Sequence, residues 1–213
     1  MQTIFEWAGD FDLEPFGVTG DATTKTITSE LTQATVLTNG YSLRFYANDA
    51  NNDKNVVGSI RLPMPLLTGL RFRMDFLTPL ANSAWDILGV EFNRYDGTNL
   101  SKTALRLNSN ADVDNDVEVL NASAAWEDIA GQTLPAMSNV WHHFDFRVNF
   151  NATAVDPTYN YLLWNGEEIT TFPDDGYNTA DATSPQFYMY IIWTVQAGAS
   201  AYMYVDNLKL EVF

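Results

Sequence analysis

The stretch Trp141–Phe150, Trp-His-His-Phe-Asp-Phe-Arg-Val-Asn-Phe, alternates between two kinds of side chain over its whole length. One set is His142, Phe144, Phe146, Val148 and Phe150, and the other is Trp141, His143, Asp145, Arg147 and Asn149. A period of two is that of a β-strand, because successive side chains point to opposite faces of a sheet. The stretch therefore predicts a long strand with one face in a core and one polar face.

The same alternation recurs in Leu70–Phe76 and Leu88–Phe92, and turn residues separate such stretches every ten or so positions, as in sandwiches and barrels. Asn165-Gly166 is a strong hairpin signal. Ala122–Ile129 could be a loop or one short helical turn capped by Ser123. Further strands are expected at Lys25–Glu30, Tyr41–Ala47, Val56–Leu62, Lys102–Leu107, Val117–Asn121, Tyr159–Trp164, Glu167–Thr171, Gln186–Val195 and Ala201–Phe213. We predict one all-β domain over residues 1–213, an antiparallel jelly-roll sandwich whose first strands lie near its last.

The composition narrows the classes of partner. Of 213 residues, 46% are hydrophobic, which is enough for a sizeable core, and the formal net charge is −16. Nucleic acid and anionic membranes repel such a chain, so a neutral partner such as sugar, or a cation, fits better. No apolar run is long enough to span a bilayer, and Met1–Trp7 lacks the features of a signal peptide. We expect the protein outside cells or on a virion surface.

Several motifs resemble those of one fold family. Trp141–Val148 followed by Tyr161–Glu168 resembles concanavalin A-like (laminin-G-like) sandwiches, in which a strand opening with Trp-x-His precedes an Asn-Gly hairpin. Tyr204–Leu210 is similar to the closing strand of many lectin-like and carbohydrate-binding modules, and Asn39–Phe45 resembles their second strand. The resemblance implies a lectin-type sandwich with a glycan-binding or adhesive role.

Residues for glycan cleavage are not evident. Glycosidases need two carboxylates on one face, and the nearest approach is Glu91-x-Asn93, where the second position is an amide. A polysaccharide lyase needs a cluster of Arg, His and Tyr, which Arg71, Arg73, His143 and Tyr188 would form only if they converged. We therefore expect a protein that is not an enzyme.

Sugar binding by a sandwich needs aromatic platforms with polar groups beside them. Packing or subunit contact is the alternative role for any one aromatic side chain on a sheet. We favour the face of Trp141, His143, Asp145 and Arg147. The wider candidate set adds the aromatic residues Tyr188, Tyr190 and Trp85 and the polar residues Arg71, Glu91 and Asn93.

Calcium is the one cofactor that the sequence suggests. Asp112, Asp114 and Asp116 offer oxygen ligands at alternate positions, although the glycine and glutamate of an EF-hand loop are missing. Ordinary turn formation is the favoured explanation of such Asn- and Asp-rich loops, and calcium binding is the alternative. His142 and His143 are adjacent, so a regular strand points them apart and they cannot share a metal.

Two functions remain open. The first is a non-catalytic, lectin-like module that binds carbohydrate or mediates adhesion. The second is a structural virion protein, such as a phage capsid-decoration or fibre protein, that uses the same sandwich for subunit contacts. The partners would be a glycan or neighbouring subunits, in a homo-oligomer or attached to a larger assembly.

Overall fold

The computed structural model describes residues 2–7, 17–22, 24–31, 41–48, 54–62, 67–79, 85–109, 116–151, 155–196 and 200–213. Within these ranges every regular element is a β-strand, and all the strands named below pair in antiparallel fashion. No helix in this part of the chain is long and apolar enough to cross a membrane. The predicted all-β class is confirmed.

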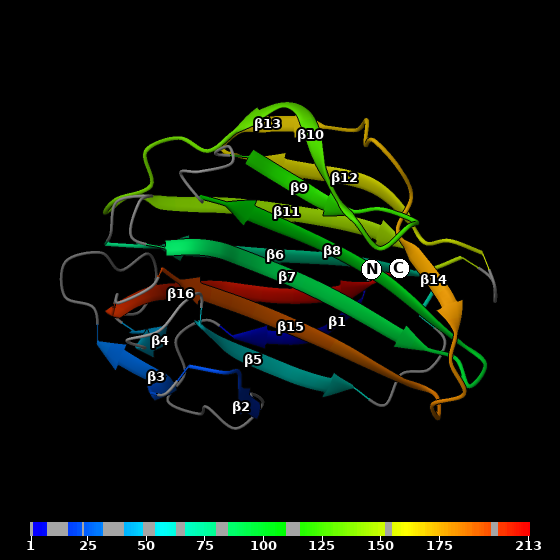
Figure 1. Cartoon of the computed structure of the whole chain (residues 1–213), viewed down its shortest axis with the longest axis horizontal. Helices are drawn as coiled ribbons and strands as arrows, with labels where there is room; N and C mark the ends of the chain where they lie inside the picture. Colours follow the sequence, from blue (N-terminus) through cyan, green and yellow to red (C-terminus); the bar gives the residue numbers. More distant parts are fainter. Residues whose placement is uncertain are drawn as a thin grey trace.

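The strands form two sheets that face each other (Figure 1). Sheet A has the order β13-β12-β11-β6-β16-β4-β3, with β1 also paired to β16. Its strands are β1 (Gln2–Trp7), β3 (Thr24–Leu31), β4 (Tyr41–Asn48), β6 (Gly69–Leu77), β11 (Trp141–Asn149), β12 (Thr158–Trp164), β13 (Glu167–Ile169) and β16 (Ser200–Val212).

Sheet B has the order β10-β9-β8-β7-β15-β5-β2, with β14 paired to β8. Its strands are β2 (Gly17–Thr19), β5 (Lys54–Leu62), β7 (Trp85–Tyr95), β8 (Asn99–Asn108), β9 (Asp116–Leu120), β10 (Trp126–Thr133), β14 (Tyr177–Ala180) and β15 (Gln186–Val195). β15 lies between β7 and β5, so a neighbouring strand pairs with it on each side.

The core lies between the sheets, and β11 shows how the sequence builds it. Phe144, Phe146 and Val148 are fully buried, as their alternation predicts. They pack beside Phe72 of β6 and beneath Phe92 of sheet B, whose ring lies 5.5 Å from that of Phe72. Apolar burial of this extent is the main term that stabilises such a sandwich.

The chain ends meet in sheet A. β1 runs beside β16, with Gln2 opposite Val212, and Figure 1 shows the N and C labels next to each other. The predicted adjacency of first and last strands is confirmed. The predicted hairpin is present too, because Asn165 and Gly166 have positive φ angles of 47° and 86° between β12 and β13. Such angles at both central residues are typical of the tight hairpin turns that match strand twist.

Of the two interpretations of Ala122–Ile129, the structure has the loop in its first part: the Asn121 side chain closes a short loop, and β10 begins at Trp126. The suggested role of Trp85 as a sugar platform is wrong. Trp85, a candidate sugar platform, is fully buried and stacks on Trp193 with ring centroids 5.1 Å apart. The sequence analysis also missed β1, β2, β10 and β14.

Tyr159 ties the two sheets together. It lies on β12 of sheet A and reaches across the core, where its hydroxyl donates to the Leu120 carbonyl at 2.6 Å. The same oxygen accepts the backbone N–H of Ala104, on β8, at 3.2 Å. Burial raises the pKa of Tyr159 far above its ordinary value, so this hydroxyl stays protonated and can donate.

Candidate functional site

The predicted site residues lie on two different faces of the sandwich. Phe72 and Phe144 of sheet A and Phe92 and Met189 of sheet B point into the core, so the alternate positions point outward. Sheet A thereby carries Trp141, His143, Asp145, Arg147 and Arg71, and sheet B carries Tyr188, Tyr190, Glu91 and Asn93. The nine residues therefore cannot form one site.

The outer face of sheet A is an ion-pair network. Arg71 forms a two-pronged bond to Asp145, through Nε to Oδ1 at 2.9 Å and through Nη2 to Oδ2. This bond raises the pKa of Arg71, because hydrogen bonding to Asp145 outweighs burial. Arg147 lies 4.5 Å over the Tyr161 ring and 3.8 Å from Asp145. Cross-strand charge pairing is thus the main role that the geometry gives these side chains.

The rest of that network is equally paired. His143 Nδ1 lies 2.5 Å from Asp75 Oδ1, and Asn207 donates to the other oxygen of Asp75 at 2.6 Å. Burial would raise the pKa of Glu211, but its ion pairs with Arg73 and Lys209 outweigh burial and lower that pKa. A ligand on this face would have to compete with these pairs.

The outer face of sheet B carries a hollow, and the register of its strands explains where the hollow lies. Tyr190 lies opposite Glu91, which lies opposite Ala104; one row further, Ile192 lies opposite Gly89. Gly89 and Ala104 are neighbours on β7 and β8, and both are small. Larger side chains surround them, so the face is hollowed at this point.

The hollow is a trough of about 200 Å³. Gly89 and Ala104 form part of its floor, Ile192 lies on one side, and Trp126 and Arg106 lie on the other. The Trp126 ring lies 4.3 Å from the Arg106 guanidinium and covers it. The sequence analysis missed the trough because the register between several strands forms it, and no single segment shows that register.

Three tyrosines extend the face beyond the trough. The rings of Tyr188 and Tyr190 stack with centroids 5.8 Å apart, and Tyr95 meets Tyr188 edge-on at 6.2 Å. Each of the three rings is partly exposed. Arg61 lies 5.9 Å from the Tyr188 ring on its other side. Tyr188 and Tyr190 project from β15, which is paired on both sides, so the sheet fixes their positions.

Polar groups lie beside these rings. Glu91 pairs with Lys102 at 2.8 Å and accepts the Asn93 side-chain amide at 2.8 Å. Because a carboxylate can only accept, this bond identifies the Asn93 atom as nitrogen and leaves Oδ1 for another partner. Asn93 is 7% exposed, and its Oδ1 is buried without a hydrogen bond. A buried acceptor left unpaired is unfavourable unless something donates to it.

The hydroxyls of Tyr190 and Tyr95 remain neutral over a wide pH range. Burial is the largest cause that raises the pKa of Tyr190 to about 12, and it also raises the pKa of Tyr95. The negative charge of Glu91 also raises both pKa values. A hydrogen bond with Asn93 lowers the pKa of Tyr190, but by less than burial raises it. These phenols can therefore donate hydrogen bonds at neutral pH.

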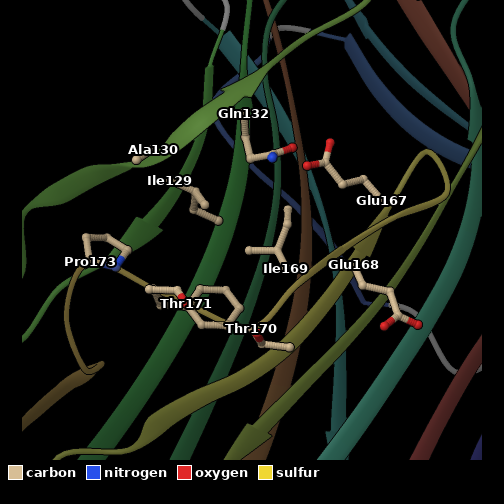
Figure 2. A pocket seen from close by; sticks show the side chains of 10 residues that line it. Ile129, Ala130, Gln132, Glu167, Glu168, Ile169, Thr170, Thr171 and Pro173 are labelled. Carbon is tan, nitrogen blue, oxygen red and sulfur yellow. The ribbon is translucent and has the colours of Figure 1, made fainter.

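The largest cavity that we describe, about 330 Å³, lies elsewhere. Figure 2 shows it between the edge strands of the two sheets, with Ile129 and Gln132 from β10 and Glu167 and Ile169 from β13. Gln132 and Glu167 point toward one another across it. No aromatic ring lines it except Phe172, so it lacks the stacking platforms of sheet B.

The sequence analysis also considered a metal site and a lyase-type cluster. The described residues hold no group of three or more His, Cys, Asp or Glu placed for a metal; Asp112 and Asp114 lie outside them, and Asp116 opens β9. Calcium therefore stays a prediction. The lyase-type set does not converge, because Arg71, Arg73 and His143 lie on sheet A and Tyr188 on sheet B.

Comparison with known proteins tests the fold. No family model and no curated protein matches the chain. Among solved structures, a double mutant of alginate lyase Aly36B in complex with alginate trisaccharide aligns over 100% of this chain and 99% of its own, with TM-score 0.60 and 12% identity. The cellulose-induced protein Cip1 aligns over 94% and 92%, with TM-score 0.57 and 10% identity.

A third structure is the exoplasmic/lumenal domain of VIP36 in its Ca²⁺-bound form. It covers 100% of this chain and 89% of its own, with TM-score 0.53 and 11% identity. The fold is the concanavalin A-like jelly roll. The family resemblance of Trp141–Val148 and Tyr161–Glu168 is therefore confirmed for the fold. At these identities the likeness goes no further than the fold.

Proposed function

We propose that the chain is a non-catalytic, lectin-like module that binds carbohydrate on the outer face of sheet B. The observation that carries the proposal is the trough over Gly89 and Ala104, with the Tyr188–Tyr190 stack at one end and Trp126 at the other. One of the similar structures, the Aly36B mutant, holds an alginate trisaccharide, which supports an oligosaccharide ligand for this fold.

The chemistry of the face suits a sugar. The apolar face of a pyranose ring packs well on an exposed aromatic ring, and the partly exposed rings of Tyr188, Tyr190 and Trp126 offer such surfaces. The neutral Tyr190 phenol could donate a hydrogen bond to a sugar hydroxyl, and the Glu91 carboxylate beside it could accept one. Few but fixed polar groups beside an apolar surface are typical of small-molecule sites.

Two observations support a binding role over catalysis. Glu91 is engaged by Lys102 and Asn93, and Glu118 holds Arg106 with two bonds of 2.5 and 2.7 Å. A binding module of this kind would act outside cells or on a virion surface, where glycans are displayed.

The test compares two tyrosines on opposite faces. Calorimetric titration against hits from a glycan array should show at least a tenfold loss of affinity for Tyr190→Ala, which removes a stacking platform. Tyr161→Ala, on the outer face of sheet A, is the matched control and should bind as the parent does. The reverse result, loss for Tyr161→Ala or Trp141→Ala alone, would move the site to the face that the sequence analysis favoured.

The structural virion role stays a prediction of the sequence. It requires a broad apolar surface for neighbouring subunits. In the described part of the chain, the large exposed hydrophobic residues are Val18, Val140, Val155 and Phe213, which lie on separate segments. Light scattering would favour the virion role if it gave a defined oligomer and the array gave no glycan.

A further inference from the structure

The charges on the outer face of sheet B indicate which class of glycan it takes. An acidic polysaccharide needs cations that are not already neutralised, because each carboxylate that it brings must exchange water for a protein partner. The relevant question is therefore whether Lys102 and Arg106, the cations in and beside the trough, are available.

Neither cation is available. Lys102 lies 2.8 Å from Glu91, on the neighbouring strand. Arg106 is held on two nitrogens by Glu118 and is covered by the Trp126 ring at 4.3 Å. A uronate carboxylate would have to displace a protein carboxylate that the fold already positions, with no gain in the number of ion pairs.

The remaining charges also disfavour an acidic ligand. Arg61, at the side of the tyrosine stack, is the cation of this face without an ion pair among the described residues, and it is exposed. Exposed single charges contribute little to binding at physiological salt. The chain as a whole carries −16, so its field repels a polyanion as it approaches.

The polar groups beside the tyrosine stack suit a ligand that can donate hydrogen bonds. The neutral Tyr190 hydroxyl can pair with a sugar hydroxyl as donor or acceptor, whereas an ionised carboxylate can only accept. Glu91 is also an acceptor, so the polar groups around the tyrosine stack are suited to hydroxyls.

The face is also long enough for several sugar rings. One row across three adjacent strands contains Tyr190 of β15, Glu91 of β7 and Ala104 of β8. On the next two strands, Trp126 of β10 lies opposite Leu120 of β9. β15 and β10 are four strand steps apart, which is about 19 Å at roughly 4.8 Å per step.

We infer that, given the proposed glycan-binding function, the ligand is a neutral oligosaccharide that crosses the strands of sheet B from the Tyr188–Tyr190 stack over the trough toward Trp126. Its affinity comes from ring stacking and hydroxyl hydrogen bonds, with no net contribution from charge. It should therefore depend on chain length and be nearly independent of salt.

The test is calorimetric titration of the intact chain with two panels of hexasaccharides. The neutral panel contains β-1,4-linked glucose, mannose, galactose and xylose, and the acidic panel contains alginate and polygalacturonate. We expect at least one neutral ligand to bind, with less than a twofold change in Kd between 20 and 300 mM NaCl. It should also bind more tightly than its own trisaccharide. Acidic ligands should bind at least tenfold more weakly at 20 mM NaCl.

Charge variants sharpen the test. Glu91→Gln frees Lys102 and should improve the affinity for the acidic ligands at least threefold at low salt. Glu167→Gln, an exposed residue of β13, removes the same charge away from this face and is the matched control. Tight, salt-sensitive binding of an acidic ligand by the parent chain would overturn the neutral-ligand inference and leave the proposed function standing. Failure of both panels would overturn the proposed function itself.

Discussion

Replacing Gly89 by valine should make the protein more stable and its trough smaller. Gly89 lies in the interior of β7, and it is absent from the positive-φ positions of the chain, so a side chain causes no backbone strain there. A Cβ atom at this position would lie 3.6 Å from Ile192 Cβ and 3.8 Å from Ile87 Cγ2, both ordinary van der Waals distances. The site therefore has room for a side chain.

The size of the effect follows from strand energetics. Glycine in a strand interior is about 0.5–1 kcal/mol less favourable than alanine, and valine is favoured further on a half-buried sheet surface. We expect Gly89→Val to raise the free energy of unfolding by about 1 kcal/mol, which is roughly 2–4 °C in Tm for a chain of this size. Three added carbons in a trough of about 200 Å³ should weaken ligand binding by about tenfold.

Urea denaturation followed by tryptophan fluorescence measures the first effect, and calorimetric titration with a bound oligosaccharide measures the second. Gly89→Ala is the control. It removes the conformational cost of glycine but adds only one carbon to the trough, so it should lose less affinity than Gly89→Val. A destabilised Gly89→Val would show that the outer face of β7 is covered. A stabilised variant with parent-like affinity would show that the trough is not part of the site.

Two further predictions concern tyrosines. Tyr159→Phe leaves the Leu120 carbonyl and the Ala104 N–H without their partner, so urea denaturation should show a loss of about 1–3 kcal/mol, and an unchanged stability would contradict the bond described above. Because the pKa of Tyr190 is raised to about 12 in the folded state, its contribution to stability is complete below the unfolded-state pKa near 10 and is lost as pH rises from there through 12. Stability measured from pH 9 to 12 should fall less steeply in Tyr190→Phe than in the parent, and equal slopes would contradict the shift.

The strands that the sequence predicted well are those with an uninterrupted run of apolar and aromatic residues on at least one face. β11 and β15 begin at the predicted residues because their alternation is uninterrupted. β10 was missed because only Ile129 of its central residues is deeply buried, so its apolar signal is weak. β2 is exposed along its whole length and has no such signal at all.

The candidate site was harder to predict, because the register between distant strands decides it. Tyr188 and Glu91 alternate as plainly as Trp141 and Asp145 do, yet nothing local says that the two pairs belong to different sheets. The trough requires knowing that Gly89 and Ala104 lie on adjacent strands near Trp126, which is a property of the pairing rather than of any one segment.

The central claim is that a glycan binds the outer face of sheet B. The most direct measurement is the change in backbone amide NMR shifts of the ¹⁵N-labelled chain on titration with the tightest-binding neutral hexasaccharide. The account predicts that the largest changes fall in Tyr188–Ile192 of β15, Gly89–Asn93 of β7 and Lys102–Arg106 of β8. Changes confined to Arg71–Asp75 of β6 and Trp141–Arg147 of β11 would place the ligand on sheet A and contradict it.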